Sequence, residues 1–259
     1  MIAAHDRLAD AIARHDGLAI AVSGGVDSMT LATFAHRLAA APVAVIHAVS
    51  PAVPPAATAR VRARAAADGW DLVVTGTGEF DDPRYRDNPV NRCYFCKTNL
   101  YDRIRTLSPH PIASGANLDD LGDYRPGLLA AAERAVVHPY IEAGMDKAAV
   151  RALARDLGAD DVAELPAQPC LASRVETGIA IDAADLAFVD RVETTLARAL
   201  PPAATVRCRI TKTGVAIEVG EEVAQIDGLA QAAARLCRDD GRAFAGVRRY
   251  RRGAMFVRT

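Results

Sequence analysis

Short apolar runs alternate with longer helical segments over the first 115 residues. The apolar runs cover residues 18–22, 42–49, 72–75 and 112–114, and the helical segments cover 4–16, 29–39 and 56–68. Runs that are apolar at every position suit strands covered on both faces. The pattern predicts an α/β domain in which helices flank a parallel sheet.

A different pattern begins near residue 180. Asp182 is placed to cap a helix that runs to about Leu200, and a second helix is expected near 224–238. Strand candidates with more polar alternation follow at 206–210, 215–219 and 244–257. We therefore expect a large α/β domain over 1–178 and a small α+β domain over 179–259.

Composition and charge narrow the class of protein. The chain has 259 residues, of which 51% are hydrophobic, and a formal net charge of −1. Its longest uncharged stretch, 38–59, contains four prolines, which a membrane-spanning helix would not tolerate. Asp6, Arg7 and Asp10 stand where a signal peptide needs an apolar core. We expect a cytoplasmic protein, with no membrane partner, whose five cysteines are thiols or ligands rather than disulfides.

The sequence SGGVDS, residues 23–28, lies between the first apolar run and the helix after it. Gly24 and Gly25 let backbone N–H groups converge on an oxyanion, which the N-terminus of the helix also favours. Ser23 and Ser28 supply hydroxyl donors, and Asp27 can hold Mg²⁺ against phosphates. Neither the Walker ending nor the dinucleotide G-x-G-x-x-G spacing is present. The hexapeptide predicts a phosphate-binding loop, with a plain glycine turn as the alternative.

SGGVDS in this position resembles the PP-loop of the ATP pyrophosphatases. The resemblance implies that this protein cleaves ATP between the α and β phosphates. The later segment SGANLDDLGDYRPG, residues 114–127, matches the glycine-x-Asn-x-Asp-Asp element of those enzymes through Gly115, Asn117, Asp119 and Asp120. Ligands of open parallel sheets bind beyond the carboxyl ends of the strands. We therefore expect this loop to meet residues 23–28 around the nucleotide, although a polar loop with a helix cap at Asp119 is the alternative.

The cysteines form a second candidate site. Cys93 and Cys96, in NRCYFCK, are spaced to share one face of a helix, and Cys170 lies in PAQPCLASR. Cys208 and Cys237 lie in apolar contexts and are expected in the core. A C-x-x-C pair alone can be a redox pair, half a zinc site or two buried thiols. Three cysteines suit a 4Fe–4S cluster with one open iron, and zinc or no metal remain as alternatives.

Five segments occur in the same order as in the LarE family of ATP-dependent sulfur transferases, which help to make the nickel-pincer nucleotide. They are SGGVDS, NRCYFCK, GANLDDLGDYRPG, HPYIEAGMDKAAVRALARDLG and PAQPCLASR. The resemblance implies that a carboxylate of a pyridinium biscarboxylic acid mononucleotide is adenylated, that Cys170 forms a thioester, and that the product is a thiocarboxylate. Some members sacrifice this cysteine, whereas others bind a 4Fe–4S cluster, and a chain with Cys93 and Cys96 resembles the second kind. A sulfur donor and a homo-oligomer are also implied.

The same resemblance assigns further residues to the substrate. They are Arg174, Glu193, Arg207, Arg209, Glu218 and Arg251, with Tyr250 beside the last of them. The last 19 residues contain six arginines and no acidic residue, for which a solvated basic edge is the alternative. After Arg174 the family carries an aromatic-glycine turn, whereas this chain reads VETG, so the resemblance does not extend to the local shape beside Cys170.

Two other functions fit some of these motifs. A tRNA thiolase also pairs a PP-loop with clustered cysteines, but RNA binding normally needs a basic field, and the chain has 31 basic against 32 acidic residues. A nucleotide-sensing or zinc-binding module would not need Asp27, Ser28 and Cys170 together. We therefore expect a small-molecule nucleotide substrate and no nucleic acid partner.

Overall fold

The computed structural model describes residues 4–38, 40–122, 125–201, 204–251, 253 and 255. It consists of two compact units: the first contains Met1–Asp82 and Cys93–Gln168, and the second contains Pro83–Arg92 and Pro169–Thr259. Residues 169–178, expected in the first domain, therefore group with the second unit. The segment Pro83–Arg92, which the sequence pattern does not distinguish, also belongs to the second unit.

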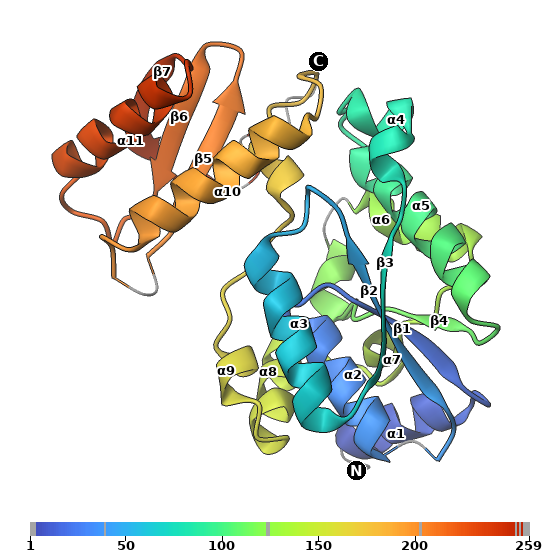
Figure 1. The fold of residues 1–259 in the computed structure, drawn as a ribbon. Helices are drawn as coiled ribbons and strands as arrows, with labels where there is room; N and C mark the ends of the chain where they lie inside the picture. Colours follow the sequence, from blue (N-terminus) through green and yellow to red (C-terminus); the bar gives the residue numbers. More distant parts are fainter. Residues whose placement is uncertain are drawn as a thin grey trace. The chain divides into compact units, whose positions relative to one another are not determined.

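Four parallel strands form the sheet of the first unit, in the order β3-β2-β1-β4 (Figure 1). They are β1 (Leu18–Val22), β2 (Val43–Val49), β3 (Asp71–Gly76) and β4 (Ile112–Ala113), which agrees with the predicted strands. The chain moves outward from β1 to β3 and then returns to the other side of β1 to form β4. The switch point, where sheets of this kind bind ligands, therefore lies between the carboxyl ends of β1 and β4.

Helices cover both faces of this sheet. They are α1 (Ala4–Ala13), α2 (Val26–Leu38), α3 (Pro55–Asp68), α5 (Arg92–Leu107), α6 (Pro126–Glu133), α7 (Pro139–Glu142), α8 (Lys147–Asp156) and α9 (Asp160–Ala163). Leu18 and Ile20 of β1 face a core built with α1, α2, α3, α7, α8 and α9, whereas Ala19 faces a second core built with α5 and α6. Side chains of a strand alternate between faces, so β1 must be apolar at every position. None of the helices in the described part of the chain is long and apolar enough to span a membrane.

The second unit is α+β. In it, β5 (Val206–Thr211) pairs antiparallel with β6 (Gly214–Val219), which pairs in parallel with β7 (Phe244–Arg249), and α10 (Ala183–Ala197) and α11 (Asp227–Asp239) pack on this sheet. The predicted cap is present, because the Asp182 carboxylate accepts the N–H of Ala184 at 2.8 Å. The strand predicted over 244–257 is wrong in length: Arg249 pairs with the last residue of β6, so no partner strand continues. Residues 252, 254 and 256–259 of that prediction lie outside the described residues.

Asn88 attaches the segment Pro83–Arg92 to the rest of the second unit. Its side chain is fully buried, its φ is +52°, and its amide donates to the carbonyl oxygens of Glu176 and Ile179, both at 2.9 Å. The backbone N–H of Gly178 donates in turn to the Asn88 carbonyl at 3.0 Å. Buried amides need such partners, so these hydrogen bonds make Pro83–Arg92 an integral part of the second unit.

Candidate functional site

The SGGVDS loop joins the carboxyl end of β1 to the first turn of α2 (Figure 1). Its two serines close the loop: the Ser23 N–H donates to Ser28 Oγ at 3.0 Å, and the two hydroxyl oxygens are 3.2 Å apart. Gly24 has a φ of +83°, and a Cβ there would lie 2.9 Å from the carbonyl oxygen of Ala57 in α3. A side chain at this position would therefore be strained and would collide with backbone.

The loop after β4 packs directly against this one. A Cβ on Gly115 would lie 2.8 Å from the backbone nitrogen of Ser28 and 2.9 Å from the carbonyl carbon of Asp27. Buried Asn117 donates from its side-chain amide to Asp27 Oδ1 at 3.1 Å. The two predicted nucleotide-binding segments are thus in contact at the switch point of the sheet, as the strand order requires.

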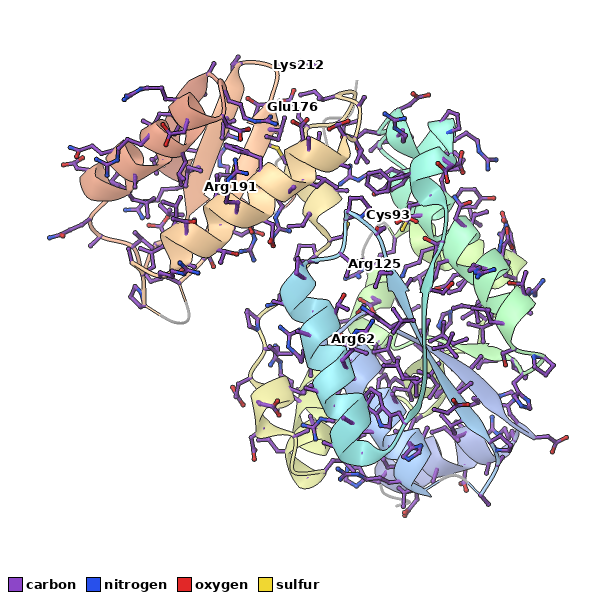
Figure 2. The ribbon with its side chains drawn as sticks, in the orientation of Figure 1. Arg62, Cys93, Arg125, Glu176, Arg191 and Lys212 are labelled. Carbon is purple, nitrogen blue, oxygen red and sulfur yellow. The ribbon has the colours of Figure 1, made fainter. Side chains whose placement is uncertain are left out.

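The two aspartates after Asn117 have structural partners. The Asp119 carboxylate accepts the backbone N–H of Lys147, the first residue of α8, at 3.3 Å, while Asp146 is the N-cap of that helix. The Asp120 carboxylate accepts the N–H of Asn117 at 3.1 Å and pairs with Arg125, which is labelled in Figure 2, at 2.8 Å. Both carboxylates hold the loop in shape.

Two residues that the sequence reasoning did not assign contact Asp27. Lys147 Nζ lies 2.5 Å from Asp27 Oδ2, with both side chains about one-third exposed (33% and 27%). The hydroxyl of buried Tyr140 donates to the Asp27 carbonyl at 3.1 Å, and burial together with the Asp27 charge raises the pKa of this phenol well above its ordinary value. Both residues lie in the segment HPYIEAGMDKAAVRALARDLG. They are 113 and 120 positions from Asp27 in the sequence, and only the fold brings them into contact with it.

Helix α3 packs against the other side of the SGGVDS loop. Arg60 donates from Nη1 to the Gly24 carbonyl at 2.5 Å. Fully buried His47, on β2, lies 2.8 Å from the Val22 carbonyl through Nδ1 and 2.9 Å from Thr58 Oγ1 through Nε2. Burial lowers the pKa of His47, and the carbonyl partner requires a proton on Nδ1. A neutral imidazole therefore ties the end of β1 to α3.

The predicted cluster ligands are divided between the two units. Cys93, labelled in Figure 2, and Cys96 lie on one face of α5 and are partly exposed, as the spacing predicts. Exposed Cys170 precedes the short helix η3 (Leu171–Arg174) of the second unit. Among the described residues, no three His, Cys, Asp or Glu side chains form a group that could hold a metal ion. Cys208 and Cys237 are fully buried, which confirms their predicted place in the core.

Arg174, a predicted substrate residue, is held by Glu193 and by the backbone at Cys170. Its guanidinium is bound by both oxygens of Glu193 at 2.9 Å, and Nη1 donates to the carbonyl of Cys170 at 3.3 Å. Burial alone would lower the pKa of Arg174, but hydrogen bonding and charge from Glu193 raise it. Arg174 therefore fixes the backbone around Cys170.

Several of the predicted substrate residues lie together in the second unit. Arg209 pairs with Glu218 at 2.6 Å, with 6% and 1% of the two side chains exposed, and Arg248 binds the other oxygen of Glu218 at 3.1 Å. Burial and the nearby charge of Arg174 lower the pKa of Arg207. Arginines outnumber carboxylates in this group, which favours an anion.

The terminal residues of the substrate prediction are only partly described. The ring of Tyr250 lies 5.7 Å from the Arg209 guanidinium, and Arg251 is exposed after β7. Arg252 and Arg258, which belong to the predicted basic edge, lie outside the described residues.

Two relatives share much of this chain. Uncharacterized protein slr1717 of Synechocystis sp. is 39% identical over 187 residues, which span 71% of this chain and 69% of slr1717. This chain belongs to the slr1717 family. Uncharacterized protein MJ0830 of Methanocaldococcus jannaschii is 27% identical over 143 residues, 54% of this chain and 55% of that protein. No family model matches the chain. Neither relative's name states an activity for the slr1717 family.

Proposed function

We propose that this chain is an ATP-dependent sulfur transferase of the LarE type, within the PP-loop superfamily. It adenylates a carboxylate of a pyridinium biscarboxylate mononucleotide and then delivers sulfur to that carbon, which gives a thiocarboxylate for nickel-pincer cofactor synthesis. The observation that carries the proposal is the contact between the SGGVDS loop and the loop of Gly115 and Asn117, centred on Asp27. Both segments resemble the nucleotide-binding elements of ATP pyrophosphatases.

The first step is the attack of a substrate carboxylate oxygen on the α-phosphorus of ATP. The bond from that phosphorus to the bridging oxygen breaks, and pyrophosphate leaves with the negative charge. The loop N–H groups, the N-terminus of α2 and the Lys147 ammonium are the groups that would stabilise this charge. Adenylation supplies a leaving group that the bare carboxylate lacks.

Asp27 fits the role predicted for it toward Mg²⁺. Magnesium takes one or two carboxylates from the protein and completes its shell with phosphates and water. Asp27 offers one partly exposed carboxylate at the loop, and its present cation is the ammonium of Lys147, a flexible point charge. Binding of Mg²⁺ to Asp27 would release Lys147 for the phosphates.

The second step is sulfur transfer at Cys170. Its thiolate attacks the acyl carbon of the adenylate and AMP departs, leaving a thioester. The thiocarboxylate is then released in one of two ways. Either a base removes the Cα proton of Cys170 and the Cβ–Sγ bond breaks, which leaves dehydroalanine, or sulfide from a donor displaces the Cys170 thiolate from the acyl carbon. Exposure of Cys170 at the start of η3 suits a nucleophile that must reach a substrate. The pair Cys93 and Cys96, on one face of α5, fits two ligands of a 4Fe–4S cluster, which when bound would carry additional sulfide. The arginine-rich group of the second unit would hold the substrate phosphate.

Exchange of labelled pyrophosphate into ATP tests the adenylation step directly. We expect exchange that depends on the carboxylate nucleotide, and we expect Cys170→Ala to keep the exchange while losing thiocarboxylate formation. Asp27→Asn should lose the exchange, whereas Asp71→Asn, at an exposed position of β3, serves as the matched control. A protein that forms neither AMP nor labelled ATP with any carboxylate nucleotide would refute the proposal.

Anaerobic purification with iron and sulfide analysis tests the cluster separately. We expect iron and visible absorption in the wild-type protein and their loss in Cys93→Ala. Iron-free protein that still transfers one sulfur per chain would show that Cys170 is sacrificed instead.

A further inference from the structure

Arg60 lies at the phosphate loop but has no place in the two steps above. It belongs to α3, and its Nη1 donates to the carbonyl of Gly24 at 2.5 Å. Its other hydrogen bonds among the described residues are long ones, from both Nη atoms to the side-chain oxygen of Gln168 at 3.3 and 3.4 Å. A guanidinium has five N–H donors, so most of its donor capacity is committed weakly or not at all within the described residues.

Arg60 also differs from neighbouring arginines in how its charge is balanced. Arg64, one turn later on α3, pairs with Asp161 at 2.9 Å, and Arg37 pairs with Asp68 at 2.7 Å. Arg60 forms no ion pair with a carboxylate among the described residues, and Asp161 acts on it only from a longer distance. Burial lowers the pKa of Arg60, and Asp161 only partly opposes that effect. Partly buried cations in proteins are normally matched by an anion, so this one lacks its counterpart.

We propose that Arg60 binds the phosphate chain of the nucleotide directly, as a second cation of the phosphate loop beside Lys147. This inference rests on the proposed function and adds a binding residue to it. Phosphate oxygens would replace the weak contact with Gln168, while the hydrogen bond to Gly24 would keep the guanidinium at the loop. Arginine suits this role because its planar fork can donate two parallel hydrogen bonds to a phosphate.

A purely structural role for Arg60 gives a different expectation. If it only held the Gly24 carbonyl, its replacement would loosen the loop before any ligand arrives. If it binds phosphate, the ligand-free loop should keep its order and only anion binding should weaken. Amide exchange of the peptide that contains Gly24 and Gly25 separates these two cases.

The test measures pyrophosphate binding by calorimetry in the presence of Mg²⁺, for wild type, Arg60→Gln and Arg60→Lys. Arg62→Gln is the matched control, because Arg62, labelled in Figure 2, is an exposed arginine on the same helix. We expect Arg60→Gln to weaken pyrophosphate binding about 10- to 100-fold, the range for a charge-assisted hydrogen bond. Arg60→Lys should recover part of the loss, since it keeps the charge without the fork.

Two results would overturn the inference and leave the proposed function intact. One is wild-type pyrophosphate affinity in Arg60→Gln, and the other is faster amide exchange of its ligand-free loop together with the loss of affinity. If the wild-type protein binds neither pyrophosphate nor ATP, the proposed function fails as well, so the two failures are distinguishable.

Discussion

Replacing Gly115 by alanine tests the contact between the two loops more directly than any change of a polar group. The new Cβ would lie 2.8 Å from the backbone nitrogen of Ser28, 2.9 Å from the carbonyl carbon of Asp27 and 3.0 Å from the Ser28 Cα. All three atoms are backbone, so no flexible side chain can move aside. Insertion of a methyl group into such a contact costs about 1–3 kcal/mol. If the loops separate to relieve it, nucleotide affinity should fall by about 5- to 150-fold.

Gly122→Ala is the matched control for this experiment. Gly122 also follows β4, but it has no atom within 4 Å of a built Cβ and no left-handed backbone. We expect titration with a non-hydrolysable ATP analogue to show the loss in Gly115→Ala alone, and near-ultraviolet circular dichroism to confirm that both variants fold. Equal ATP affinity in the two variants would refute the idea that this contact forms the nucleotide site.

Three further predictions follow from buried groups. In metal-free native protein, Cys208 and Cys237 should resist a thiol reagent until the chain is unfolded, because both are buried and burial raises the pKa of each; fast reaction of all five thiols would contradict this. Burial lowers the pKa of His47 from 6.5, so the unfolded chain gains the proton first as the pH falls through that value. The free energy of unfolding should then decrease by up to about 1.4 kcal/mol per pH unit, and His47→Asn should flatten this dependence in denaturant titrations. Finally, Glu218→Gln leaves the buried guanidinium of Arg209 without its carboxylate and should destabilise the protein by about 3–5 kcal/mol, measured by urea unfolding.

The sheet and the position of the SGGVDS loop between β1 and α2 could be predicted because each leaves a local signal. Strands buried on both faces are apolar at every position, and the glycines of SGGVDS lie directly between a strand and a helix. The partnership of Asp27 with Lys147 has no such signal, because it depends on where α8 lies after the chain has folded. The end of β7 is likewise fixed by the length of its neighbour β6 and not by its own residues. The sequence also does not reveal the structural role of Asn88, because a polar residue before a proline is typical of a turn.

The passage of the backbone through the second unit limits how this protein can be dissected. The chain enters that unit at Pro83, leaves it after Arg92 and enters again at Pro169. A fragment truncated after residue 178 would keep Asn88 but lose Ile179, which accepts a hydrogen bond from it. A fragment that begins at Pro169 would lack the segment Pro83–Arg92, and with it Asn88. Neither half is therefore expected to express as a stable module, and exchange of the C-terminal region between relatives requires that Pro83–Arg92 be transplanted with it.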